Sequence, residues 1–452
     1  MTNPISARHA ALIVLHKTFT QEAYANLALN EILQKNPLSH VDRRLTTELV
    51  YGTVKNKAIL EFWLKKFIPK YKDLPEWISL NLMLAVYQIH FMDKIPKSAA
   101  VNEAVILAKK YGHKGTIALT NGVLRNMLRT ADAFALPDEK NKIHYLSIKY
   151  SHPEWIVEKW LDQFGLEETE ALLAFDNKNP PLTIRINPLK TTRKALIELL
   201  NKDEVVCEEG KYSPYAIEVK GMPPLHNYQP FKDGLFQIQD ESSMLAGSIL
   251  DPHPGEIVID VCAAPGGKTT HIAELMGNEG KVIAFDVHEH KIKLINDNAE
   301  RLGINIIQAK HLDARVIGEK YPEFADRVLV DAPCSGLGVL RRRPDARWRK
   351  DMADIKGLTV LQSEILASAA LAVKKGGVLV YSTCTLSNEE NIQVVDKFLE
   401  KNPQFEREDV TPFLPIMPSG GELTAPKGYI TIYPHLHKID GFFICRMHRR
   451  KK

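Results

Sequence analysis

Four short apolar runs in the last half of the chain constrain its fold more than any other feature. The runs are EIVIDV, KVIAFDV, DRVLVDA and GGVLVYST, and segments with a helical pattern, such as HKIKLINDNAERLG, lie between them. Strands that are apolar at nearly every position suit a sheet buried on both faces, and the helices between them provide the crossovers that parallel strands require. Residues 234–450 are therefore predicted to form an α/β domain with a doubly wound, Rossmann-like sheet.

The first part of the chain has a different period. Its apolar residues recur at intervals of three and four, as in Leu45, Leu49 and Val50, which places them on one face of a helix. Residues that interrupt helices separate these periodic segments at Pro75, Pro96 and Gly112. Residues 1–135 are predicted to form an all-α helical bundle.

A short mixed region lies between the bundle and the large sheet. It follows a linker-like stretch at residues 132–142, which is rich in charge and contains a proline. Residues 182–187 and 216–219 alternate as strands do, and residues 192–202 have a helical pattern. Residues 143–233 are therefore predicted to form a small α/β module.

Positive charge is concentrated at the N-terminal end. Residues 1–135 contain 18 Lys and Arg against 10 Asp and Glu, a net charge of +8, although the whole chain carries only +4. Clustered positive charge favours phosphate backbones because binding releases their counterions. The bundle is thus expected to contact nucleic acid, although a solvated helical face explains the same charge. The same two interpretations apply to three basic residues of the small module, which are Arg185, Lys190 and Arg193.

Several classes of protein are disfavoured by composition. No apolar run reaches the roughly 18 residues of a membrane span, and the N-terminus lacks the apolar core of a secretory signal. The five cysteines are odd in number and show no paired spacing typical of zinc sites. We therefore expect a cytoplasmic, monomeric protein that uses neither a membrane nor a metal.

The first apolar run of the large sheet leads into a glycine-rich loop, DVCAAPGGKTT, at residues 260–270. Its adjacent glycines allow the backbone to approach a ligand closely before a helix begins. A phosphate-binding loop would need glycine five residues before Gly267, where Cys262 stands, and a dinucleotide loop would need separated glycines. The loop is predicted to bind a cofactor of another kind.

Acidic residues follow the next two strands of the same predicted sheet. Asp286 ends the second run, about 20 residues beyond the loop, where a carboxylate can accept hydrogen bonds from ribose hydroxyls. Asp313 follows the apolar stretch at residues 304–309 and could accept a hydrogen bond from an adenine amino group. An aspartate in that position is also a common turn or helix cap.

Two cysteines follow the remaining two strands, in DAPCSG at residues 331–336 and YSTCT at residues 381–385. A free cysteine is usually an inert core residue, but two at strand ends beside a cofactor loop are typical of reactive thiols. Reactive thiols in this position would suit methylation of carbon 5 of cytosine. That carbon becomes nucleophilic only after a thiolate adds to carbon 6, which is covalent catalysis by an activated cysteine. The spacing alone does not choose between Cys334 and Cys384 as the nucleophile. Asp331 is placed to hydrogen-bond the base or, alternatively, to cap its strand.

The runs DVCAAPGGKT, VLVDAPCSG and VYSTCTLSNEEN together resemble the Nop/Sun family of RNA cytosine carbon-5 methyltransferases. The helical part, with DRRLTTELVYGTVKNKAIL, AAVNEAVILAKK and TNGVLRNMLR, resembles the NusB-like RNA-binding domain. This resemblance covers essentially the whole chain. It implies a class I methyltransferase fold, S-adenosyl-L-methionine as the cofactor and RNA as the partner, with 16S ribosomal RNA favoured.

The resemblance also implies roles for individual residues. It makes Cys384 the nucleophile, Cys334 the residue that helps to release the product, and Asp331 a contact of both base and cofactor. It places S-adenosylmethionine against the following residues: Cys262, Ala263, Ala264, Pro265, Gly266, Gly267, Lys268, Asp286, Asp313 and Asp331.

Two further stretches carry polar signals. The segment at residues 341–349, here called the arginine segment, has five arginines around Trp348 and is predicted to hold RNA phosphates and a splayed base. A solvated basic helix start is the alternative. The C-terminal YITIYPHLHKIDGFFICRM is predicted to add strands to the sheet, and its His435 and His437 lack the partners of a zinc site.

Two rival functions differ from cytosine methylation of 16S ribosomal RNA. The first is the same chemistry on transfer RNA or large-subunit ribosomal RNA. The second is a non-catalytic RNA-binding or ribosome-assembly factor that retains the fold. The presence of both Cys334 and Cys384 argues against the second rival.

Overall fold

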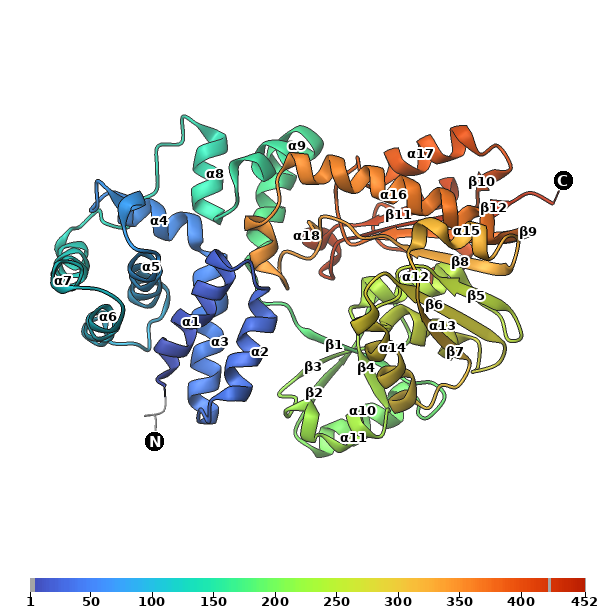
Figure 1. The fold of residues 1–452 in the computed structure, drawn as a ribbon, viewed down its shortest axis with the longest axis horizontal. Helices are drawn as coiled ribbons and strands as arrows, with labels where there is room; N and C mark the ends of the chain where they lie inside the picture. The colour runs from blue at the N-terminus through green and yellow to red at the C-terminus, as the bar shows by residue number, and fades with distance from the viewer. Residues whose placement is uncertain (1–4, 422–423, 452) are drawn as a thin grey trace. The chain divides into compact units, whose positions relative to one another are not determined.

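The computed structural model describes residues 5–421 and 424–451, and these form two compact units (Figure 1). The first unit contains the chain up to Lys178 together with Leu340–Lys350. The second contains Asn179–Val339 and Asp351–Lys452. The three domains predicted along the sequence are thus distributed over two units in space, and each unit is described by itself.

The first unit is helical, as predicted. Its helices are α1 (Ala7–Thr20), α2 (Ala25–Lys35), α3 (His40–Lys55), α4 (Lys57–Lys65), α5 (Glu76–Phe91), α6 (Lys97–Tyr111), α7 (Lys114–Arg129), α8 (Lys142–Tyr150) and α9 (Glu154–Asp176), with 3-10 turns η1 (Tyr71–Asp73) and η4 (Pro344–Trp348). The predicted breakers are confirmed, since Pro75 and Pro96 directly precede α5 and α6, and Gly112 directly follows α6.

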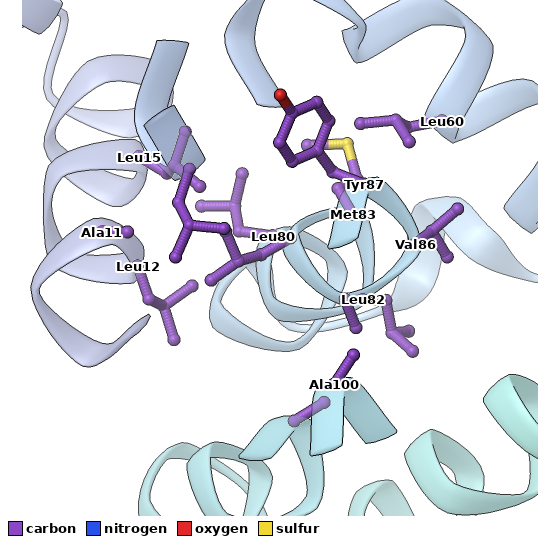
Figure 2. Close-up of a cluster of buried hydrophobic side chains, with 14 of the residues drawn as sticks. Ala11, Leu12, Leu15, Leu60, Leu80, Leu82, Met83, Val86, Tyr87 and Ala100 are labelled. Atoms are coloured by element: carbon purple, nitrogen blue, oxygen red, sulfur yellow. The ribbon is translucent and has the colours of Figure 1, made fainter. Parts of the chain in front are cut away.

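Helix α5 lies at the centre of the bundle, and eleven of its residues are buried. Figure 2 shows its side chains, among them Met83 and Val86, surrounded by Leu12 of α1, Leu60 of α4 and Ala100 of α6. A helix that is apolar on all sides must be covered on all sides. The bundle core is therefore built around α5.

The second unit contains the predicted large sheet. Its strands are β5 (Ile257–Asp260), β6 (Lys281–Asp286), β7 (Ile307–His311), β8 (Ala325–Asp331), β9 (Val373–Thr383), β10 (Phe405–Arg407), β11 (Tyr429–Ile432) and β12 (Phe442–Arg449). The order is β10-β12-β9-β8-β5-β6-β7, and β11 pairs with β12. Strands β5 to β9 are parallel to their neighbours among themselves, whereas β10, β11 and β12 join in antiparallel fashion. The doubly wound sheet and its C-terminal strands are confirmed.

Helices cover both faces of this sheet. One face is covered by α12 (Glu241–Leu250), α13 (Gly267–Leu275) and α14 (Glu289–Leu302), and the other by α15 (Ile317–Lys320), α16 (Met352–Ala372) and α17 (Ile392–Lys401). Along β8, Val328 and Val330 pack on the second face and Leu329 on the first. This burial on both sides explains why the strands are apolar at nearly every position.

Helix α16 is, among the described residues, the one helix long and apolar enough to meet the length and composition of a membrane span. It packs against β8 and β9 and against α15 and α17. These contacts are those of a core helix that covers a sheet.

The strands of the small module lie in the second unit, whereas residues 143–178 of its predicted range belong to the first unit, mostly to α8 and α9. The module has an antiparallel sheet of order β2-β3-β1-β4, formed by β1 (Leu182–Ile186), β2 (Val206–Glu209), β3 (Ala216–Lys220) and β4 (Phe236–Ile238), with helices α10 (Arg193–Lys202) and α11 (Gln229–Lys232). Leu196 and Leu200 of α10 pack against Ile184 and Ile217 of the sheet. The predicted strands and helix are confirmed, and Thr192 caps α10 by accepting a hydrogen bond from the Ala195 amide.

Arg185 of the small module does not serve as an RNA contact, because its side chain is fully buried. Its guanidinium pairs with Glu274 of α13, with an Nε–Oε2 distance of 2.8 Å, and its Nη1 donates to the carbonyl oxygen of Gly267 at 2.7 Å. A buried arginine needs such partners to offset its desolvation. Arg185 therefore ties the small module to the helix that follows the glycine-rich loop.

The prediction that the arginine segment holds RNA is also wrong for Arg347 and Trp348. Arg347 is fully buried in the first unit, where its Nη1 donates to the carbonyl oxygen of Ser151 (3.1 Å) and to Asn177 Oδ1 (2.9 Å). Trp348 Nε1 donates to the carbonyl oxygen of Val54 at 2.9 Å. These acceptors lie at the C-terminal ends of α8, α9 and α3, where unpaired carbonyls attract cationic and donor groups. Arg347 and Trp348 therefore fix the segment to the ends of these helices.

Candidate active site

The predicted site residues lie at the carboxyl ends of neighbouring parallel strands. In the sheet order β9-β8-β5-β6-β7, the ends carry in turn Cys384, the stretch from Asp331 to Cys334, the glycine-rich loop, Asp286 and Asp313. Strand order reverses at β5, which has β8 on one side and β6 on the other. Ligands of such sheets bind outside the carboxyl ends at this switch point. The fold thus places these residues along one edge.

The glycine-rich loop joins β5 to α13. Gly266 has φ of +99°, a conformation that favours glycine, and a Cβ at that position would lie 3.2 Å from the Cα of Ile295. No side chain caps the N-terminus of α13, and the space around a Cβ at Gly267 is open to 4 Å. Thr269 Oγ1 donates to Asp260 Oδ2 at 2.7 Å and holds the first turn against the strand end. The loop therefore offers an uncapped helix N-terminus to an anionic group.

Asp286 is buried at the end of β6 and faces this loop. Its carboxylate accepts hydrogen bonds from the backbone amides of Ala264 (3.3 Å) and His288 (2.9 Å). Two amide donors fix the side chain and leave further lone pairs for a ligand's hydroxyl groups. This arrangement suits the ribose contact expected of Asp286.

Asp313 differs from Asp286 because a local partner occupies its carboxylate. It caps the turn η3 (Ala314–Val316) and forms an ion pair with Arg315, with an Nη2–Oδ2 distance of 2.7 Å. Hydrogen bonds from Arg315 hold the pKa of Asp313 below its usual value. Asp313 must share its carboxylate with Arg315 in order to bind an adenine amino group.

The sulfur atoms of Cys334 and Cys384 lie 3.3 Å apart, and both side chains are partly exposed. The contact with the Cys384 sulfur, the exclusion of water and the charge of Glu390 raise the pKa of the Cys334 thiol well above its ordinary value. In a pair at this distance one sulfur donates its proton to the other. Either sulfur could be the donor in this contact, and the raised pKa favours the protonated form of Cys334.

Cys262 behaves differently from this pair, although it belongs to the glycine-rich loop. Loss of contact with water, together with the charges of Asp260 and Asp331, raises the pKa of its thiol well above the ordinary value. A thiolate is the reactive form of cysteine. Cys262 is thus a neutral packing residue of the loop.

Asp331 links the loop to the thiol-bearing strands. Its Oδ2 lies 2.8 Å from Lys268 Nζ, and its Oδ1 accepts a hydrogen bond from Ser382 Oγ at 2.9 Å. Burial opposes the charge of Lys268, but the charges of Asp331 and Cys384 outweigh it and raise the pKa of Lys268. The Nζ atom of Lys268 also lies over the aromatic ring of Phe442, 4.9 Å from the ring centroid. A fixed cation and a fixed carboxylate therefore stand beside the thiol pair.

The sequence reasoning missed Ser382 and the part that Lys268 plays toward Asp331. Ser382 lies in the run YSTCTLS, in which the hydroxyl-bearing residues are buried at the end of β9 and just beyond it, where apolar residues would be expected. Buried hydroxyl groups need hydrogen-bond partners. That polar run was the signal that could have indicated a hydrogen-bonded network around the cysteines.

His437, one of the two C-terminal histidines, has a structural role. His437 ends the short helix α18 (Pro434–His437), where its Nδ1 accepts from the Tyr433 amide at 2.8 Å and its Nε2 lies 2.9 Å from the carbonyl oxygen of Ser419. Within residues 5–421 and 424–451, no group of three or more His, Cys, Asp or Glu side chains is arranged to hold a metal ion.

Three family models match the chain. Residues 247–448 match 16S rRNA methyltransferase RsmB/F, residues 5–129 match the NusB family, and residues 152–226 match the ferredoxin-like domain of RsmF/B-like methyltransferases. The matches correspond to the large sheet, the helical bundle and the region of the small module.

Two curated relatives align over nearly the whole chain. "Probable ribosomal RNA small subunit methyltransferase B" of Bacillus subtilis (strain 168) is 42% identical over 454 residues, which are 98% of this chain and 99% of that protein. The chain belongs to the 16S rRNA methyltransferase RsmB/F family. The protein of the same name from Synechocystis sp. (strain ATCC 27184 / PCC 6803 / Kazusa) is 40% identical over 447 residues, 98% of this chain and 99% of its own length.

Two solved structures have a similar fold. The crystal structure of PH0851 has a TM-score of 0.84 and 30% identity, and it covers 98% of this chain and 99% of its own. NSun6 from Pyrococcus horikoshii, solved with SFG, has a TM-score of 0.60 and 26% identity over 66% of this chain and 98% of its own. The protein is a methyltransferase with a NusB-like bundle, a ferredoxin-like module and a class I methyltransferase domain.

Proposed function

We propose that the protein transfers a methyl group from S-adenosylmethionine to carbon 5 of one specific cytosine in 16S ribosomal RNA, through a covalent bond between Cys384 and carbon 6. The observation that carries this proposal is the pair of sulfur atoms 3.3 Å apart at the strand ends beside the glycine-rich loop. Addition and later elimination at carbon 6 need one sulfur that bonds and a second group that assists its departure.

The resemblance to the RNA cytosine methyltransferases, and not the geometry, selects Cys384 over Cys334 as the proposed nucleophile. The Cys384 thiolate would form the bond to carbon 6, and the displaced electron pair of the ring would make carbon 5 nucleophilic, so that carbon 5 would take the methyl group as the bond from that methyl to the sulfonium sulfur breaks. The carbon 5 proton then leaves to a base, and the carbon–sulfur electron pair returns to Cys384, which restores the aromatic ring. The Lys268 ammonium, which interacts electrostatically with Cys384, favours the thiolate form of that sulfur.

Cys334 is proposed to assist the elimination. Its raised pKa keeps the proton on this sulfur, so that the S–H group can donate to the departing Cys384 thiolate across 3.3 Å. A thiolate that accepts such a hydrogen bond is a better leaving group. Without this donor the covalent adduct should persist.

Asp331 is proposed to hold the base. One carboxylate oxygen faces Lys268 and the other faces Ser382, so the side chain is fixed before substrate arrives. A fixed carboxylate can accept hydrogen bonds from the exocyclic amine and the protonated ring nitrogen of the adduct. Preorganisation of this kind lowers the cost of stabilising the charge that develops on the ring.

The residues around the loop fit S-adenosylmethionine, which supplies an electrophilic methyl group when bound. The uncapped N-terminus of α13 and the open space at Gly267 suit a carboxylate, and Asp286 has free lone pairs for ribose hydroxyls. Asp313 is proposed to contact the adenine. The residues from Cys262 to Lys268 and Asp331 are proposed to contact the cofactor as well.

The helical bundle is proposed to bind the RNA. The α6–α7 hairpin exposes basic residues with few acidic neighbours, and these are Lys109, Lys110, Lys114, Arg125 and Arg129. Such a group favours phosphates. The target cytosine must leave any base stack to reach Cys384. We further propose that the protein acts in the cytoplasm and as a monomer, and sedimentation of the purified chain would test its oligomeric state.

Bisulfite sequencing of total RNA from cells with and without the gene tests this function. We expect one cytosine of 16S ribosomal RNA to lose its protection in the deletion, and to regain it with wild-type protein or Cys207→Ser, but not with Cys384→Ala. Cys207 lies on β2 and serves as the matched control. Loss of a site in transfer RNA or large-subunit RNA instead would overturn the substrate. Loss of no site would favour an assembly factor.

A further inference from the structure

Glu390 is a fully buried carboxylate six positions beyond Cys384, in the run TLSNEEN. A buried charge is costly unless hydrogen bonds compensate for the lost water. The carboxylate accepts four hydrogen bonds from neutral donors: the Ser335 amide (2.8 Å), Ser335 Oγ (2.5 Å), Thr385 Oγ1 (3.2 Å) and Gln362 Nε2 (3.1 Å). None of the steps proposed above uses this group.

The donors to Glu390 flank both reactive thiols. Ser335 directly follows Cys334, and Thr385 directly follows Cys384. The two hydroxyl groups also lie 2.8 Å from each other. The carboxylate of Glu390 therefore bridges the loop after β8 to the loop after β9 at the residues next to the two sulfur atoms.

Neighbouring contacts fix the bridge itself. Tyr381 Oη donates to the Glu390 carbonyl oxygen at 2.7 Å, which holds the backbone of Glu390 against β9. Gln362 Nε2 also donates to the Pro333 carbonyl oxygen at 2.9 Å, so α16 holds the peptide before Cys334. A side chain whose surroundings are locked in this way positions its neighbours within a few tenths of an ångström.

We propose that Glu390 is a positioning residue that sets the separation and orientation of the Cys334 and Cys384 sulfur atoms. The inference deepens the proposed function and rests on it for its catalytic consequence, but the geometry of the thiol pair can be measured without methyl transfer. The negative charge of Glu390 also favours the protonated form of Cys334. Glu390 thereby supports the division of roles between the two thiols.

Oxidation by diamide tests the geometry directly. Diamide takes two electrons and two protons from a pair of thiols, which form a disulfide, and peptide mass spectrometry of the full chain measures the Cys334–Cys384 product over time. Glu390→Ala should slow formation of this disulfide at least about tenfold, and Glu390→Gln, which keeps the shape, should slow it less. Glu389→Ala is the matched control and should oxidise at the wild-type rate.

Methyl transfer gives the second readout. We expect Glu390→Ala to lower kcat about 100-fold with little change in KM for S-adenosylmethionine, because displaced thiols affect bonding to the base and not cofactor binding. Wild-type oxidation rates in folded Glu390→Ala and Glu390→Gln would overturn the positioning role. If Glu390→Ala does not fold, Glu390→Gln and Thr385→Val decide by the same assay. A wild-type protein without cytosine methylation would overturn the proposed function and leave the oxidation result standing.

Discussion

The thiol pair of Cys334 and Cys384 and the arginine segment are the two most chemically distinctive parts of the sequence, and the structure treats them in opposite ways. The thiols lie partly exposed at neighbouring strand ends, 3.3 Å apart. Arg347 of the arginine segment is instead fully buried, and its donors pair with carbonyl and amide oxygens at helix ends. Both parts looked functional in the sequence.

The difference between them teaches what makes a polar signal functional. The cysteines were interpreted from their position at the carboxyl ends of strands, a place that the fold class itself assigns to ligands. The arginines were interpreted from residue type alone, and residue type is equally compatible with capping helix C-termini. Position relative to a predictable fold is therefore stronger evidence than composition.

The largest effect is expected at the nucleophile. Cys384→Ala removes the only group proposed to bond carbon 6, so methyl transfer should fall by at least about 10⁴-fold. Incorporation of labelled methyl groups into 16S ribosomal RNA measures this, with Cys207→Ser as the control. A Cys384→Ala protein that keeps most of its activity would make the thiol pair no more functional than the arginine segment.

The arginine segment should respond in stability and not in RNA binding. Arg347→Ala leaves buried carbonyls without donors and should lower the free energy of unfolding of the helical unit by about 3 kcal/mol. Urea unfolding followed by tryptophan fluorescence measures it, and Arg343→Ala, which changes an exposed arginine of the same segment, should have little effect. An unchanged stability combined with weaker RNA binding would restore the original prediction for this segment.

A smaller effect, on the KM for S-adenosylmethionine, is expected to differ between Asp286 and Asp313. Asp286→Ala should raise KM for S-adenosylmethionine about tenfold, because hydrogen bonds to a carboxylate contribute about 1.5–3 kcal/mol each. Asp313→Ala should raise it only about threefold, since Arg315 already occupies that carboxylate. Equal effects at the two positions would show that Arg315 gives way to the cofactor.

The smallest effect is expected on the exposed surface of the bundle. Replacing Lys109, Lys110 and Lys114 by Gln should weaken RNA binding modestly and reduce its salt dependence, by about 0.7 in the logarithmic slope for each lost phosphate contact. Titrations at several salt concentrations measure the slope. An unchanged slope would mean that these lysines only keep the surface of the bundle solvated and do not bind RNA, just as Arg347 of the arginine segment has a structural role.

Much of the fold could be predicted because it follows from periodicity. Apolar runs located the parallel strands, and Pro96 and Gly112 marked the two ends of α6. The spatial grouping could not be predicted in the same way, because Leu340–Lys350 joins the helical unit through long-range contacts that no local pattern records. Tertiary contacts of this kind decide which polar residues are buried.

The candidate site, like the fold, could be predicted only where it follows from local sequence patterns. Strand ends indicated Cys334, Cys384, Asp286 and Asp331, and the structure brings the two cysteines together. Glu390 was not predicted, since an acidic residue in a polar loop normally faces solvent. Only the folded chain shows that its carboxylate is buried between the two loops.

Covalent trapping tests the central claim most directly. Cys334→Ala protein, incubated with S-adenosylmethionine and a 16S ribosomal RNA fragment, should accumulate a protein–RNA adduct that resists denaturing electrophoresis. Peptide mass spectrometry should place a methylated cytidine on Cys384, and Cys334→Ala/Cys384→Ala should form no adduct. An adduct on another residue, or none under conditions in which the wild-type protein methylates the fragment, would contradict the account.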